Sequence, residues 1–77
     1  MTLKDLAVGV SGRVARYESG GRGYRKKLLA MGLTPGTPFS VTRVAPMGDP
    51  VEILVRGFKL SLRKDEAAAV QVEAIDG

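Results

Sequence analysis

The chain has 77 residues, enough for one small domain with a thin hydrophobic core. It contains neither cysteine nor histidine, which excludes disulfides, thiolate metal sites and the commonest general base. Twelve Lys and Arg residues against eight Asp and Glu give a net charge of +4, which weakly favours acidic partners. No apolar run approaches the roughly 20 residues of a membrane span. We therefore expect a single cytoplasmic domain over residues 1–77.

The first predicted element is a short helical turn at residues 2–5. Thr2 is a suitable cap for it, and Asp5 can reach back to the start of the turn as in a capping box. Residues 13–17 then predict a first strand. Its alternation is imperfect and places Arg16 on the same side as Val14.

A glycine-rich loop at residues 19–23 leads into the one long helix that we predict. Tyr24, Leu28 and Met31 fall on one face of that helix. Gly32 suits the left-handed position just past the helix end, and Leu33 then folds back toward Leu28 in a Schellman ending. Residues 34–36 form a turn into the next strand, because Pro and Gly there stop the helix.

The rest of the chain reads as short strands. Alternating apolar residues predict strands at residues 37–44, 51–55, 58–62 and 70–74, with a helical turn at residues 63–68. Five short strands with one helix between the first and second do not suit a parallel sheet, because one connection alone is long enough for a crossover. The sequence predicts a mostly β fold, a small SH3-like five-stranded barrel, and a five-stranded oligonucleotide-binding barrel is the alternative.

Several blocks of the sequence resemble the FeoA family, the ferrous iron transport protein A. The blocks are Leu3-Lys4-Asp5-Leu6, Gly12-Arg13-Val14, Met31-Gly32-Leu33-Thr34-Pro35-Gly36, Val44-Ala45-Pro46-Met47-Gly48-Asp49-Pro50 and Gly57-Phe58-Lys59-Leu60-Ser61-Leu62-Arg63. Together they cover essentially the whole chain. The resemblance implies an SH3-like barrel and a partner: FeoB, the membrane transporter for Fe²⁺ whose cytoplasmic part is a GTP-binding domain. It also implies a non-enzymatic accessory protein at the inner face of the membrane.

Small barrels of this type bind peptide segments in surface grooves beside their loops. We therefore expect a partner surface to involve Arg25, Met31, Leu33, Pro46, Met47, Asp49, Pro50 and Leu54. Met47 is attractive because a flexible thioether adapts to a partner. Asp49 is expected to cap its own turn rather than to bind metal.

Three alternatives remain open from the sequence. Direct weak carriage of Fe²⁺ would depend on carboxylates such as the adjacent Asp65 and Glu66, because the chain offers neither His nor Cys. Nucleic-acid binding is compatible with the charge but lacks basic and aromatic residues interleaved on a strand. Arg22 or Arg25 could be inserted into the partner's GTP site. We expect no catalytic residue, cofactor or metal site in this chain, and homo-oligomers are possible.

Overall fold

The computed structural model describes residues 1–18 and 22–75. Its elements are a 3-10 helix η1 (Leu3–Asp5), β1 (Ser11–Tyr17), α1 (Arg22–Ala30), β2 (Pro38–Val44), β3 (Val51–Val55), β4 (Phe58–Leu62), α2 (Lys64–Ala68) and β5 (Val70–Ile75). The predicted bounds of β3 and β4 are confirmed, and the other elements differ by one or two residues at their ends. Most of the glycine-rich loop predicted at residues 19–23 lies outside the described residues.

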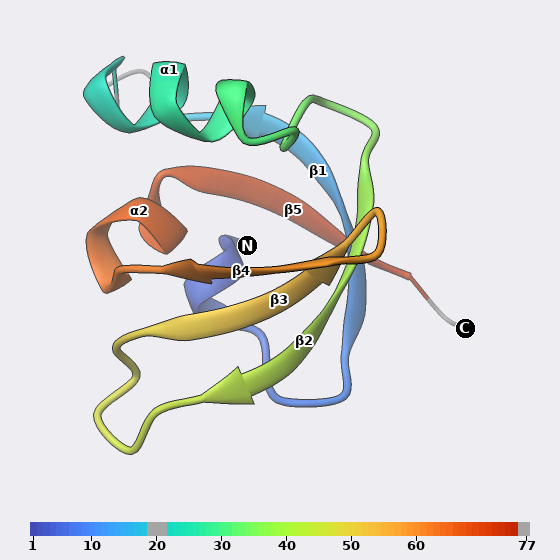
Figure 1. The fold of residues 1–77 in the computed structure, drawn as a ribbon, viewed down its shortest axis with the longest axis vertical. Coiled ribbons are helices and arrows are strands. Elements are labelled where there is room, and N and C mark those ends of the chain that lie inside the picture. The colour runs from blue at the N-terminus through green and yellow to red at the C-terminus, as the bar shows by residue number, and fades with distance from the viewer. Residues whose placement is uncertain (19–21, 76–77) are drawn as a thin grey trace.

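The five strands form one antiparallel sheet in the order β4-β3-β2-β1-β5. β1 pairs with β2 on one side and with β5 on the other, and β4 and β5 are the two edges. Figure 1 shows the strands bending around a common interior, with α2 joining β4 to β5 and α1 lying across one end of the molecule. This arrangement confirms the predicted mostly β fold with one inserted helix between β1 and β2.

The interior is filled by aliphatic side chains from every strand. The most deeply buried large residues are Leu3, Leu28, Leu33, Ile53, Leu62, Val14, Val41, Val51 and Val70. Phe39 on β2 packs directly over Gly12 on β1, its partner in the ladder. A Cβ atom at position 12 would lie 2.9 Å from the Phe39 ring, so the close approach of the ring requires glycine there.

The facing predicted for Arg16 is wrong, and a β-bulge explains why. Val14 pairs with Val72 and Arg16 pairs with Gln71, so Ala15 is the extra residue on β1. The bulge shifts the alternation by one residue. As a result Arg16 is exposed, whereas both Val14 and Tyr17 pack against the core.

The N-terminal turn has the predicted geometry. The Asp5 carboxylate accepts hydrogen bonds from the Thr2 backbone N–H at 2.9 Å and from the Thr2 hydroxyl at 3.2 Å. These two donors hold the pKa of Asp5 below its usual range. The start of the chain is also pinned to β5, since the Val72 N–H donates to the Met1 carbonyl at 3.0 Å.

The end of α1 is the predicted Schellman motif. The Leu33 N–H donates to the Leu28 carbonyl at 3.0 Å, and the Gly32 N–H donates to the Leu29 carbonyl at 3.1 Å. Gly32 has a φ of +98°, a backbone conformation that favours glycine. Leu33 is thereby returned to the core, where it is fully buried. Neither of the described α-helices is long and apolar enough to cross a membrane.

Candidate docking surface

The acidic side chains of the described residues do not form a metal centre. Among residues 1–18 and 22–75, no three Asp or Glu residues gather closely enough to hold an ion. Glu66, one of the two adjacent carboxylates named as a weak Fe²⁺ site, is buried and already engaged. The Lys27 ammonium donates to its Oε2 at 2.6 Å, and the Arg63 backbone N–H donates to its Oε1 at 2.8 Å. These contacts lower the pKa of Glu66, the Lys27 hydrogen bond being the largest cause.

Half of the predicted partner surface lies on the loop between β2 and β3. Pro46, Met47, Asp49 and Pro50 are all exposed, and the Met47 side chain is 86% exposed. The loop is closed at its base, where the Ala45 N–H donates to the Pro50 carbonyl at 3.1 Å. This loop therefore presents an exposed thioether on a braced support, the kind of side chain that adapts to a partner.

Asp49 does not cap its own turn, contrary to the sequence-based prediction. Its Oδ1 accepts a hydrogen bond from the Lys64 backbone N–H at 3.3 Å, at the start of α2. The carboxylate thus joins the β2–β3 loop to the helix after β4. Asp49 also lines a depression of about 350 Å³ together with Tyr24 of α1 and the first residues of α2.

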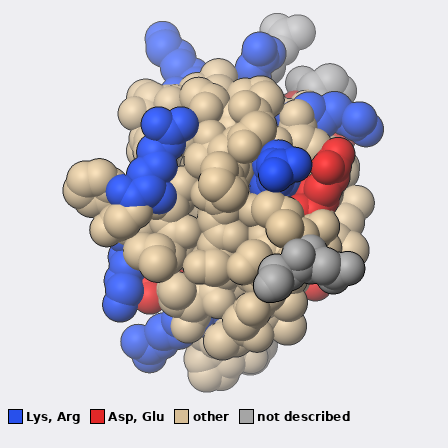
Figure 2. Space-filling model, turned by 90° about the vertical axis from the view of Figure 1, so that its right-hand side faces the viewer, with Lys and Arg blue, Asp and Glu red and all other residues tan. Residues whose placement is uncertain are grey.

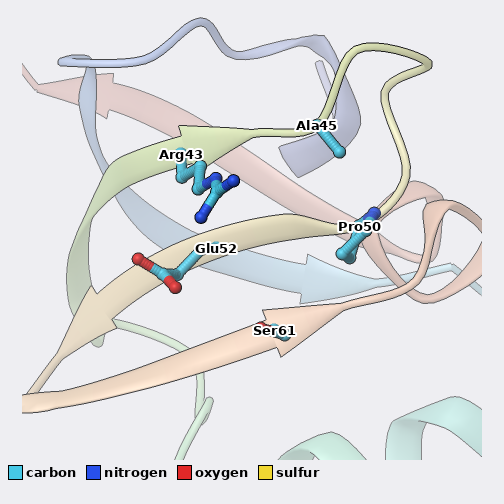
Figure 3. Close-up of a pocket in the computed structure, with 5 residues that line it drawn as sticks. All are labelled: Arg43, Ala45, Pro50, Glu52 and Ser61. Carbon is cyan, nitrogen blue, oxygen red and sulfur yellow. The ribbon is translucent and has the colours of Figure 1, made fainter.

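A second, smaller hollow lies beside the same loop on the outer face of the sheet (Figure 3). It measures about 160 Å³ and is lined by Arg43, Ala45, Pro50, Glu52 and Ser61. Arg43 on β2 and Glu52 on β3 are opposite each other in the strand register. The Glu52 carboxylate accepts a hydrogen bond from the Thr42 hydroxyl at 2.9 Å. This hollow is small, so it suits contact with a protein surface better than enclosure of a small molecule.

Leu54 lies on the same outer face as Glu52, two residues along β3, and is 38% exposed. Phe58, which the sequence alternation assigned to a regular strand, is 71% exposed. It is opposite the buried Val55 at the rim of the sheet, immediately after the Arg56-Gly57 turn. The sequence position of Phe58, directly after a two-residue hairpin turn, could have indicated this exposure, because few side chains pack against the end of a strand.

The remaining three predicted residues belong to α1 and its ending. Arg25 is exposed, and Met31 is partly buried against the core. Leu33 is fully buried, so its assignment to a partner surface is wrong: the Schellman ending uses it as an internal anchor. Two further residues that the partner surface did not include, Arg16 and Tyr24, line depressions beside this helix.

Basic side chains are dispersed over the face that Figure 2 displays. Lys and Arg lie both at the edge of that face and within it, and they do not join in one continuous stripe. Nucleic-acid binding normally uses a basic stripe with aromatic stacking platforms. The face displayed does not have that organisation.

Comparison with known proteins identifies the domain. A family model described as the FeoA domain matches residues 1–74. A fusion of Fe²⁺ transport protein A and the Fe²⁺ transporter FeoB from Porphyromonas gingivalis is 38% identical over 76 residues. The match covers 97% of this chain and 9% of that protein, so the chain spans a small part of its length.

Solved structures give the same result. Iron(II) transport protein A from Clostridium thermocellum has a TM-score of 0.87 and 37% identity, over 97% of this chain and 46% of that chain. FeoA of Stenotrophomonas maltophilia, described as a prokaryotic SH3 domain protein and solved with zinc, has a TM-score of 0.82 and 25% identity. That match covers 95% of this chain and 89% of the other. The SH3-like fold is confirmed in preference to the oligonucleotide-binding barrel, and the chain belongs to the FeoA family.

Proposed function

We propose that this chain is a non-enzymatic regulator of Fe²⁺ uptake that docks on the cytoplasmic GTP-binding region of a FeoB-type transporter. The observation that carries the proposal is the fusion relative, in which a domain 38% identical to this chain is part of one polypeptide with a FeoB transporter. A covalent link raises the effective concentration of two modules that work together. The same partnership between separate chains requires a docking surface.

Exposed apolar side chains on the β2–β3 loop and on the outer face of β3 support such a surface. Met47 is 86% exposed and Leu54 is 38% exposed. The exposed part of an apolar side chain contributes little to the stability of the folded domain, but its burial by a partner is favourable. The loop is braced by Asp49 and by its own base, so little conformational entropy is lost when a partner binds it.

The test is co-purification with the cytoplasmic domain of the candidate transporter, with and without guanine nucleotide. We expect the wild-type chain to be retained, and Met47→Asp and Leu54→Asp to be retained at least about tenfold less, because each places a charge in an apolar contact. Val8→Asp is the matched control, since Val8 is 58% exposed in the turn before β1. Failure of the wild-type chain to bind would overturn the proposal. If Met47→Asp and Leu54→Asp both bind as the wild type does, this surface is not the docking site.

A further inference from the structure

A groove runs between α1 and the end of β1, on a part of the surface separate from the β2–β3 loop. It has a volume of about 250 Å³ and is lined by Arg16, Tyr17, Arg25, Leu29 and Pro35. Tyr17 and Leu29 are partly buried, and Pro35 is exposed, so the groove has an apolar floor. Arg16 and Arg25 are both exposed and contribute one guanidinium from the strand and one from the helix.

The lining of this groove contains two positive charges and no acidic side chain. Among residues 1–18 and 22–75 the one ion pair is between Lys27 and Glu66, so neither arginine is neutralised by a described carboxylate. The Tyr17 hydroxyl donates to the Leu33 carbonyl, and burial raises the pKa of Tyr17 to about 12. The phenol is therefore neutral at physiological pH and does not offset the two charges.

Both walls of the groove are held by features already described. The bulge at Ala15 turns Arg16 outward on β1, and the Schellman ending at Gly32 fixes the far end of the helix that bears Arg25. The two guanidinium groups therefore start from anchored backbone positions. Arginine is well suited to such a site, because its planar fork binds a carboxylate in a bidentate manner.

From this arrangement we infer that the groove binds an acidic peptide segment of a partner protein. A carboxylate of the segment lies between Arg16 and Arg25, and a neighbouring apolar side chain packs on Leu29 and Pro35. Charge complementarity selects an acidic partner, and the apolar floor selects a peptide over a nucleic acid, which would need exposed aromatic faces for its bases. The inference deepens the proposed function, because it names the chemistry by which this chain would recognise its partner.

The direct test uses a panel of fluorescein-labelled octapeptides, each with two glutamates and one leucine at different spacings. Fluorescence anisotropy gives the affinity, and backbone amide shifts in NMR spectra locate the site. We expect at least one peptide to bind in the groove. The double variant Arg16→Glu/Arg25→Glu should weaken that binding at least about thirtyfold, because both charge-assisted contacts become repulsive.

Matched controls separate this site from general electrostatic attraction. Lys4→Glu/Arg13→Glu changes the net charge equally, at two exposed basic residues that line neither the groove nor the hollow beside the β2–β3 loop, and should change the affinity by no more than about twofold. Replacing the glutamates of the best peptide by glutamine, or its leucine by serine, should weaken binding at least about tenfold. Absence of binding across the panel, equal losses in the two double variants, or tighter binding of a single-stranded oligonucleotide to the groove would overturn the inference.

The same variants distinguish this inference from the proposed function. If the transporter's cytoplasmic domain retains the wild-type chain and Arg16→Glu/Arg25→Glu equally, the proposed function stands and the groove is not the recognition site. If acidic peptides bind in the groove but the transporter domain retains neither chain, the groove inference stands and the proposed partner is wrong. If the transporter domain retains the wild-type chain but not Arg16→Glu/Arg25→Glu, the result supports both the proposed function and the groove inference.

Discussion

The sheet and the helix α1 are held in place in different ways. β1 pairs with β5 from Ser11 to Tyr17 and with β2 from Ser11 to Arg13, and the buried residues of the strands form one hydrophobic cluster. α1 has nine residues, yet Leu28 is its one fully buried side chain among those described. Its other attachments are the ion pair from Lys27 to Glu66 and the link through Gly32 to Leu33. A lightly attached helix can devote most of its surface to recognition at little cost in stability.

The largest expected effect is in the sheet. Ile53 is completely buried at the centre of β3, so Ile53→Ala should lower the free energy of unfolding by about 2–5 kcal/mol through lost burial and a new cavity. Urea denaturation followed by circular dichroism measures this loss. If Ile53→Ala leaves no folded protein, Ile53→Val gives a measurable loss of about 0.5–1.5 kcal/mol. An unchanged midpoint for both would contradict the view that the sheet carries the stability.

Leu28→Ala should cost less, about 2–3 kcal/mol, although Leu28 is just as buried. The cost of a cavity depends on how well the structure collapses into it, and a helix with few other anchors can settle inward. Hydrogen exchange should show loss of protection in the α1 amides while the β1, β2 and β3 amides remain protected. Equal loss of protection in the strands would show instead that helix and sheet unfold as one unit.

The ion pair between the two helices should contribute less again. Lys27→Met keeps the aliphatic stem but leaves the buried Glu66 carboxylate without its cation, which should cost about 1–2 kcal/mol at pH 7. Because the pKa of Glu66 is lowered in the folded state, the wild-type contribution is present above the unfolded-state value near 4.5 and is lost as pH falls through the lower folded-state value. Urea midpoints between pH 7 and pH 3 should therefore fall less steeply for Lys27→Met than for the wild type. The pKa of Asp5 is lowered in both proteins, so its part of the slope cancels in the comparison.

The smallest expected effect is a gain. Arg56 has a φ of +51° in the hairpin between β3 and β4, a left-handed conformation that costs a long side chain more than it costs asparagine. Arg56→Asn should raise the free energy of unfolding by about 0.3–1 kcal/mol, partly offset by loss of the 3.4 Å hydrogen bond to Thr37. Thermal denaturation measures it. A lower melting temperature would show that this hydrogen bond outweighs the backbone strain.

The elements whose local pattern agrees with their tertiary role were predictable from sequence. The clean alternation of β3, the hairpin glycine and the glycine stop of α1 each depend on a few neighbouring residues, and all three are observed. The side of β1 on which Arg16 lies was not predictable, because it depends on a bulge set by pairing with β5. The hydrogen bond that Asp49 accepts was not predictable either, because its donor, the Lys64 N–H, is 15 positions away along the chain.

The candidate site was harder to predict than the fold. Leu33 was assigned to the partner surface although the predicted Schellman ending already folded it back toward Leu28, and its full burial shows that the second prediction was the correct one. Arg16 on β1 and Arg25 on α1 line the same groove. No local spacing in the sequence indicates this, because the loop after β1 separates the two residues along the chain.

The glycine stop of α1 also sets an angle. Leu33 is buried in the interior and holds the end of α1 in place. The side of the helix that Arg25 faces therefore depends on how many residues separate it from Gly32. Each helical residue rotates the next by about 100°. A single residue inserted between Arg25 and Lys27 would rotate that guanidinium to another side of the helix, while Lys27, the buried Leu28 and the paired strands kept their places. The spacing between Arg25 and Gly32 therefore sets the direction in which this guanidinium faces on the outer surface. Such an insertion can change that direction in evolution without disturbing the folded interior.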